Sequence, residues 1–136
     1  MEYRIGHLAY HTKDMEKSLK FYTEVLGFRH IFGIPDDKGN KWIEYIMGPD
    51  GRFIELFYPN ENETIVEGGT YMHLCLEVDD CAAAVKELAE KGISSDVKQG
   101  SDGNYQAWIK DPDGRDIEIM QLVEASEQYQ HRNGLK

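Results

Sequence analysis

The chain of 136 residues contains no long apolar run and no excess of positive charge. No run approaches the roughly 18–20 apolar residues that a membrane-spanning helix needs. The net charge of −10 argues against nucleic acid and anionic membranes as partners, because both require a basic protein surface. The first five residues, MEYRI, do not form a basic-then-apolar leader, so we expect no signal peptide. The composition therefore predicts a soluble, cytoplasmic globular protein.

Cysteine is scarce as well, with Cys75 and Cys81 as the two examples. They do not form a Cys-x-x-Cys motif, and two cysteines cannot supply a dense disulfide framework. Cys75 falls on a predicted strand and Cys81 at the start of a predicted helix. We expect both to be free thiols in a reducing compartment.

The sequence contains an internal repeat. The first copy begins at His7 and closes with the segment 49–56, PDGRFIEL, and the second begins at His73 and closes with 112–119, PDGRDIEI. The offset between copies is 66 residues at the histidines and 63 at the glutamates of these closing segments, Glu55 and Glu118. A repeat of this length predicts two copies of one supersecondary unit.

Each copy has the same predicted order of elements, strand–helix–strand–strand–strand. Asp14 and Asp80 are candidate N-caps, and Gly27 and Gly92 mark helix ends. The two Pro-Asp-Gly sequences predict tight turns between the last two strands of each copy. The first copy predicts strands at 3–11, 28–32, 42–47 and 53–58 around a helix at 15–26. The second predicts strands at 71–78, 95–98, 105–110 and 116–123 around a helix at 81–91.

We therefore expect an α+β fold in which two βαβββ modules pair about a pseudo-twofold axis around a shared cleft. The first module occupies residues 1–59 and the second 71–123. A linker at 60–70 joins them, and 124–136 forms a polar C-terminal tail.

His7, Glu55, His73 and Glu118 are the candidate metal ligands. Taken singly, such a histidine is more often a core or rim residue, and such a glutamate more often lies on a solvated strand face. The recurrence of both at equivalent places favours a site, since pairing of the modules brings all four together. Each glutamate lies between apolar residues that pack on the opposite face of its strand. Two imidazoles and two carboxylates can bind a divalent transition metal and leave positions open for substrate.

Two further residues are candidate substrate contacts. His11 lies four residues from His7, roughly 13 Å along an extended strand, so both cannot bind one ion without a bend. His11 is therefore assigned to the cleft rim. Cys75 shares the strand face of His73 and is assigned to the pocket wall, with a nucleophilic role as the alternative. His30 and His131 are expected in a loop and in the tail.

Several motifs together resemble glyoxalase I (lactoylglutathione lyase) of the vicinal-oxygen-chelate superfamily, from His7 to about Leu122. They are the first-strand His7, the helix signature Asp14-x4-Leu19-x-Phe21-Tyr22-x3-Leu26-Gly27-Phe28, Ile54-Glu55-Leu56, His73-Leu74-x-Leu76-x-Val78-Asp79, and Asp111-Pro112-Asp113-Gly114-x2-Ile117-Glu118.

The resemblance implies a lyase or isomerase with one divalent transition metal per site, nickel or cobalt in preference to zinc. His7, Glu55, His73 and Glu118 would be its ligands, and Glu118, with Glu55 on the other face, would carry protons. The implied substrate is a hemithioacetal or another small α-hydroxycarbonyl compound that reacts through a metal-bound enediolate.

The same scaffold leaves alternatives open, namely an epimerase and a non-catalytic drug-binding protein. The chain departs from glyoxalase I at His11 and Pro59, where that family has the Arg and Asn that help to hold glutathione. This departure favours a different carrier. The resemblance to the short glyoxalase I type also implies a homodimer whose cleft combines His7 and Glu55 of one chain with His73 and Glu118 of the other. The linker between the modules equally permits both pairs to come from one chain.

Overall fold

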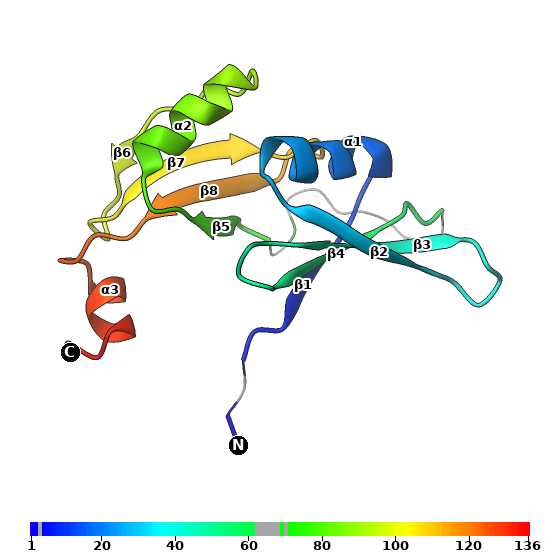
Figure 1. Ribbon diagram of the computed structural model, residues 1–136, viewed down its shortest axis with the longest axis horizontal. Helices are drawn as coiled ribbons and strands as arrows, with labels where there is room; N and C mark the ends of the chain where they lie inside the picture. Colours follow the sequence, from blue (N-terminus) through cyan, green and yellow to red (C-terminus); the bar gives the residue numbers. More distant parts are fainter. Residues whose placement is uncertain (3, 62–68, 70) are drawn as a thin grey trace. The chain divides into compact units, whose positions relative to one another are not determined.

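The computed structural model describes residues 1–2, 4–61, 69 and 71–136. The chain divides into two units, Met1–Gly69 and Thr70–Lys136 (Figure 1). Most of the predicted linker, 60–70, lies outside the described residues, as does position 3 of the first predicted strand.

The first unit contains one four-stranded mixed sheet in the described part of the chain, with the strand order β1-β4-β3-β2. β1 and β4 run parallel, and the other neighbours are antiparallel. Its elements are β1 (His7–His11), α1 (Met15–Lys20), the π-helix η1 (Phe21–Val25), β2 (Arg29–Pro35), β3 (Lys41–Met47) and β4 (Phe53–Phe57).

The second unit repeats this topology, with the strand order β5-β8-β7-β6 and a parallel β5–β8 pair. The predicted α+β class and the repeated βαβββ unit are therefore confirmed. Its elements in the described residues are β5 (Leu74–Glu77), α2 (Cys81–Glu90), β6 (Lys98–Gln99), β7 (Tyr105–Lys110), β8 (Asp116–Gln121) and α3 (Glu127–Arg132).

The helix boundaries follow the local capping signals. The Asp14 side chain accepts a hydrogen bond from the Lys17 amide at 3.1 Å, and Asp80 accepts one from Ala83 at 2.9 Å. Gly27 and Gly92, with φ of +75° and +84°, adopt the left-handed conformation that ends a helix at low steric cost. The sequence therefore predicts both helix starts and both stops correctly.

The first helix differs from the prediction in its interior. It changes from α-helix to π-helix at Phe21, so the predicted continuous helix to Leu26 is wrong in detail. Ser18 and Phe21 are buried, whereas Leu19 and Leu26 remain partly exposed. A π turn contains an extra residue, and this residue rotates the side chains that follow it.

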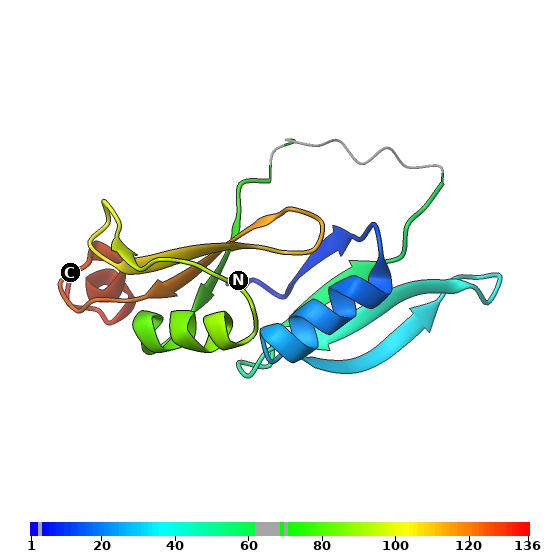
Figure 2. The same ribbon diagram turned by 90° about the horizontal axis from the view of Figure 1, so that it is seen from above.

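The helix of each unit covers one face of its own sheet (Figures 1 and 2). In β4, Ile54 and Leu56 are buried, and the alternate residues are partly exposed. In β8, Ile117 and Ile119 belong to the core that α2 covers. Because strand side chains alternate between faces, Glu55 and Glu118 point to the sheet face opposite the helix.

The segment after Glu124, predicted as a polar tail, contains the short helix α3. Ser126 caps it by accepting a hydrogen bond from the Tyr129 amide at 3.2 Å. Arg132 on α3 binds both carboxylate oxygens of Glu77 on β5, at 2.7 and 2.9 Å. These contacts attach the C-terminal segment to the sheet of the second unit.

None of the helices in the described ranges is both long and apolar enough to cross a membrane.

Candidate metal centre

In the first unit, a histidine and a glutamate meet across two parallel strands. The register of β1 and β4 sets Ala9 beside Glu55, and His7 is two residues earlier on the same face of β1. His7 Nε2 lies 3.5 Å from Glu55 Oε1. The imidazole is 53% exposed and the carboxylate 13% exposed, so the histidine is the more accessible member of the pair.

The second unit builds the same pair from equivalent residues. Cys75 on β5 is in register with Glu118 on β8, and His73 immediately precedes β5. His73 Nε2 lies 3.1 Å from Glu118 Oε2. The imidazole is 35% exposed and the carboxylate 10% exposed. The two units thus present matching nitrogen–oxygen donor pairs.

The donor spacing within each pair fits a shared transition-metal ion. Two ligand atoms bound at about 2.1 Å to one ion, at angles between a right angle and the tetrahedral angle, are roughly 3.0–3.4 Å apart. The separations of 3.5 and 3.1 Å lie close to this range. Across the described residues, no group of three or more His, Cys, Asp and Glu side chains is arranged to hold an ion. The four-ligand centre, which needs one pair from each unit, stays a prediction.

The surroundings of Glu55 are aromatic. Tyr45 on β3 lies directly opposite Glu55 on β4. Hydrogen bonding to the Glu55 carboxylate is the main cause that raises the pKa of Tyr45, with burial second. The Tyr45 ring stacks on Phe32 at a centroid distance of 4.4 Å and meets Phe53 edge-on at 6.0 Å. Sequence reasoning missed Tyr45, although its place on a strand of alternating apolar residues provides a signal.

The surroundings of Glu118 differ. Trp108 on β7 lies opposite it, but the indole N–H donates to the Gln106 side chain at 2.8 Å. The Trp108 ring meets the His73 ring edge-on at 4.9 Å. Cys75, on the parallel neighbour β5, lies directly opposite Glu118.

The thiol of Cys75 is poorly suited to nucleophilic attack. Burial, followed by the charge of Glu118 and the hydrogen bond to it, raises the pKa of Cys75 to about 12. A thiol with this pKa stays protonated at neutral pH, whereas a reactive cysteine needs the thiolate. The raised pKa therefore argues against the nucleophilic alternative, and the assignment of Cys75 to a pocket wall stays a prediction.

The other histidines lie apart from the two donor pairs. His11 lies opposite Phe57 in the sheet register, and the centroids of the two rings are 5.6 Å apart.

The sequence-based expectation that His30 lies in a loop is wrong. His30 lies on β2, and its Nε2 is 2.6 Å from Glu44 Oε2. Glu44 also accepts a hydrogen bond from the Tyr58 phenol at 3.0 Å. Glu44 and Tyr45 are consecutive residues of β3, so their side chains point to opposite faces of the sheet. Because Tyr45 is on the face of Glu55, the group of His30, Glu44 and Tyr58 lies on the other face.

Residues 4–119 match the glyoxalase/bleomycin resistance protein/dioxygenase superfamily. The chain belongs to this superfamily. The chain is 34% identical to a probable lactoylglutathione lyase of Vibrio parahaemolyticus, and the match covers 90% of this chain and 94% of that protein.

Two solved structures have the same fold as this chain. A lactoylglutathione lyase from Agrobacterium tumefaciens superposes with a TM-score of 0.68 at 18% identity, covering 87% of this chain and 92% of that one. An antibiotic binding protein from a Streptomyces species superposes with a TM-score of 0.70 at 27% identity, covering 90% and 98%. The fold is therefore that of a glyoxalase I-like protein of the vicinal-oxygen-chelate superfamily.

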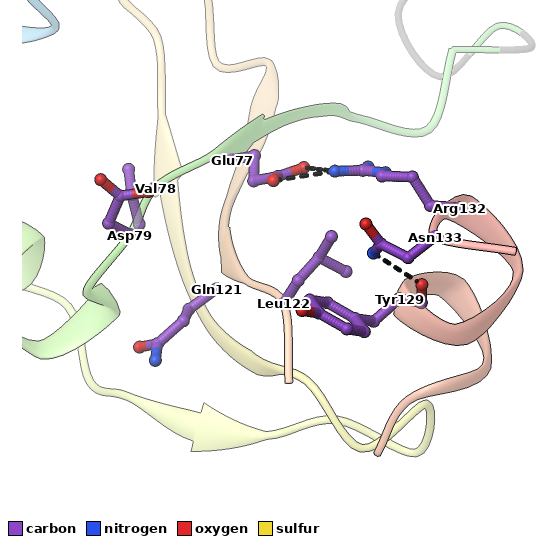
Figure 3. Close-up of a pocket in the computed structure, with 8 residues that line it drawn as sticks. All are labelled: Glu77, Val78, Asp79, Gln121, Leu122, Tyr129, Arg132 and Asn133. Atoms are coloured by element: carbon purple, nitrogen blue, oxygen red, sulfur yellow. Dashed lines mark hydrogen bonds and ion pairs between the residues drawn. The ribbon is translucent and has the colours of Figure 1, made fainter. Parts of the chain in front are cut away.

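The second unit of this glyoxalase-superfamily chain also holds a pocket of about 280 Å³ (Figure 3). Glu77 of β5, Gln121 of β8 and Tyr129 and Arg132 of α3 are among its lining residues. The Glu77–Arg132 ion pair lies along one side of this pocket. None of the predicted metal ligands lines it, and Glu77 is the repeat counterpart of His11.

Proposed function

We propose that the protein is a metal-dependent lyase of the glyoxalase I type, acting on a hemithioacetal or another α-hydroxycarbonyl compound. The observation that carries the proposal is the repeated donor pair, His7 with Glu55 and His73 with Glu118. The relative named as a probable lactoylglutathione lyase supports the reaction class.

The two donor pairs would hold one divalent transition ion per site, nickel or cobalt in preference to zinc. When bound, the ion supplies positive charge that polarises adjacent substrate oxygens and stabilises negative charge formed on them. His7 and His73 would hold the ion through their ring nitrogens and would take no part in proton transfer. A cleft that combines a pair from each of two chains would make the working unit a homodimer.

Glu118 is the proposed proton carrier. Its carboxylate takes the proton from one carbon of the substrate and returns it to the neighbouring carbon, so the rearrangement involves no net oxidation. Its low exposure, 10%, favours this role, because a partly buried carboxylate exchanges protons with substrate in competition with little water. Glu55 would act as a metal ligand without carrying the proton.

The residues near Glu55 point to a substrate other than a glutathione adduct. His11 and Pro59 stand where a glutathione-binding glyoxalase I has Arg and Asn. The rings of Phe32, Tyr45 and Phe53 form an apolar surface beside Glu55 instead. We propose an α-hydroxycarbonyl substrate with an apolar carrier group, and His11 and Cys75 as its contacts at the rim and wall.

A second candidate is non-catalytic binding of a small apolar ligand. The similarity in fold to an antibiotic binding protein and the aromatic surface beside Glu55 favour it. Epimerisation is the third, since it needs the same proton removal but returns the proton to the original carbon.

Metal analysis combined with a substrate panel tests the proposal. Protein purified without chelator is analysed for metal and then assayed on glutathione and apolar-thiol adducts of α-ketoaldehydes and on simple hydroxyketones. Turnover that requires the metal and rearranges the adduct supports a lyase, while solvent deuterium incorporation with racemisation alone supports an epimerase. Tight binding of apolar ligands without turnover of any compound would leave the binding role.

A further inference from the structure

The two histidines of the donor pairs differ in how the chain holds them. His7 belongs to β1 and is in register with Phe53 of β4. The register between β5 and β8 begins at Leu74, so His73 lies just outside the strand pairing. His73 is nevertheless the less exposed imidazole, at 35% against 53%, and lies closer to its glutamate, at 3.1 Å against 3.5 Å. Contacts other than strand pairing therefore hold the ring of His73.

Trp108 provides such a contact. It lies on β7 opposite Glu118, and its ring meets the His73 imidazole edge-on, at 82° and with the centroids 4.9 Å apart. Rings attract each other in this orientation, because the positive edge of one meets the negative face of the other. The imidazole of His73 thus contacts both the indole and the Glu118 carboxylate.

The first unit has a different arrangement at the equivalent place. Tyr45 lies opposite Glu55, as Trp108 lies opposite Glu118, but its ring packs on Phe32 and Phe53. Among the residues that the structure describes, no aromatic ring contacts His7. The contact between the indole and the histidine is therefore a property of the second unit.

Trp108 is itself fixed by hydrogen bonds. Its side chain is 43% exposed, so packing alone does not determine its orientation. The indole N–H donates to Gln106 Oε1 at 2.8 Å. Ser95 Oγ donates to the Trp108 carbonyl at 2.8 Å and accepts from its amide at 3.1 Å. Gly100 leaves the room that the Gln106 amide occupies, since a Cβ there would come within 2.1 Å of its nitrogen.

We propose that Trp108 is a positioning residue that holds the His73 imidazole in place at the proposed metal centre, and that Gln106 fixes the indole for this role. The proposal rests on the proposed function, in which His73 is a metal ligand. A ligand that is already held in its binding orientation loses less conformational freedom when the ion binds. The stabilisation typical of one aromatic pair corresponds to roughly a two- to tenfold change in a binding constant.

The first test uses Trp108→Leu, which removes the ring. Trp42→Leu is the matched control, because Trp42 is 45% exposed and meets Phe57 of the first unit edge-on, at 83° and 5.8 Å. Each full-length variant is titrated with Co²⁺, and its visible absorption spectrum is recorded. We expect Trp108→Leu to raise the dissociation constant roughly two- to tenfold and to shift the spectrum, and Trp42→Leu to change neither.

The second test uses metal-free protein. The chain has two tryptophans, so a nitrogen–proton correlation spectrum contains two indole N–H signals, and Trp42→Leu shows which of them belongs to Trp108. His73→Ala should move the Trp108 signal, because it removes the imidazole beside the indole. His131→Ala removes the imidazole of another histidine–glutamate pair in the second unit and should leave that signal in place. Gln106→Met, which removes the acceptor, should also move it.

The outcomes separate this proposal from the proposed function. Wild type that binds Co²⁺ while Trp108→Leu has unchanged affinity overturns the role of Trp108 alone, and so does a Trp108 signal that does not respond to His73→Ala. A signal that does not respond to Gln106→Met overturns the role of Gln106. Wild type that binds no Co²⁺ overturns the proposed function and with it the role of Trp108 at a metal centre, even if the Trp108 signal responds to His73→Ala.

Discussion

His73 Nε2 lies 3.1 Å from Glu118 Oε2, although 45 residues separate them along the chain. The parallel pairing of β5 with β8 brings them together, and the pairing of β1 with β4 does the same for the first unit. A donor pair of this kind is half of the predicted metal centre, so its members are the first targets for mutation.

His73→Ala should abolish or strongly reduce metal binding, because it removes one of the two nitrogen ligands. Elemental analysis of protein purified without chelator should give about one divalent ion per wild-type chain and much less in the variant. His131→Ala is the control, since His131 also faces a glutamate, Glu127 at 3.3 Å, but lies on the exposed helix α3. Equal metal content in wild type and His73→Ala would contradict the assignment.

Glu118→Gln should lower kcat by several orders of magnitude on the true substrate and leave the fold intact. The substitution keeps the shape of the side chain but removes its charge and its capacity to carry a proton. Steady-state kinetics with circular dichroism checks both parts. Glu87→Gln, at an exposed position on α2, should match wild type. Near-wild-type turnover by Glu118→Gln would exclude it as the proton carrier.

Mixing two inactive variants tests whether the site is shared between chains. If each cleft combines His7 and Glu55 of one chain with His73 and Glu118 of the other, a heterodimer of His7→Ala and Glu118→Gln carries both lesions in one cleft. Its other cleft is intact, so mixing should restore part of the activity. Sites formed within single chains would each keep a lesion, and mixing would restore nothing.

Asp111→Ala should destabilise the protein far more than Asp50→Ala, at the equivalent turn. Asp111 is buried and accepts bonds from the amides of Asp113 and Arg115, both at 2.9 Å, and from the Arg115 guanidinium at 3.2 Å. Its loss leaves Arg115 short of a partner, at a cost on the order of 3 kcal/mol.

Asp50 is exposed, and its side chain accepts a hydrogen bond from the Arg52 amide at 3.1 Å. Asp50→Ala should therefore lower the free energy of unfolding by less than about 1 kcal/mol. Urea denaturation of both variants measures the difference. Similar losses in the two would show that the burial of Asp111 contributes little.

Cys75 should resist alkylation in the folded, metal-free protein. With its pKa raised to about 12, the thiol at pH 8 is almost wholly protonated, and its iodoacetamide reaction should be on the order of a thousandfold slower than that of an ordinary cysteine. The alkylation rate should rise as the pH is raised from 8 toward the pKa of the thiol, because the thiolate fraction rises. Glu118→Gln should accelerate alkylation, because it removes the charge that opposes the thiolate. Mass spectrometry of timed samples follows the reaction, and rapid labelling at pH 8 would contradict the raised pKa.

Local signals account for much of what the sequence determined by itself. Asp14 and Asp80 cap their helices, Gly27 and Gly92 end them, and Gly51 and Gly114 supply the positive φ of the two Pro-Asp-Gly turns. These signals depend on a few consecutive residues, so they can be read without knowledge of the fold. The internal repeat then indicated the topology, because two segments with the same motifs in the same order are expected to form the same supersecondary unit.

Tertiary structure alone decided which residues meet across strands. Strand register set the distance between His7 and Glu55 and placed Tyr45, not a neighbour in sequence, against the Glu55 carboxylate. The pairing of β2 with β3 likewise brings His30, which was expected in a loop, into contact with Glu44. The packing of α3 on the second sheet brings Arg132 into an ion pair with Glu77. Such contacts depend on register and packing between distant segments, and a shift of one residue would turn each side chain to the other face of its sheet.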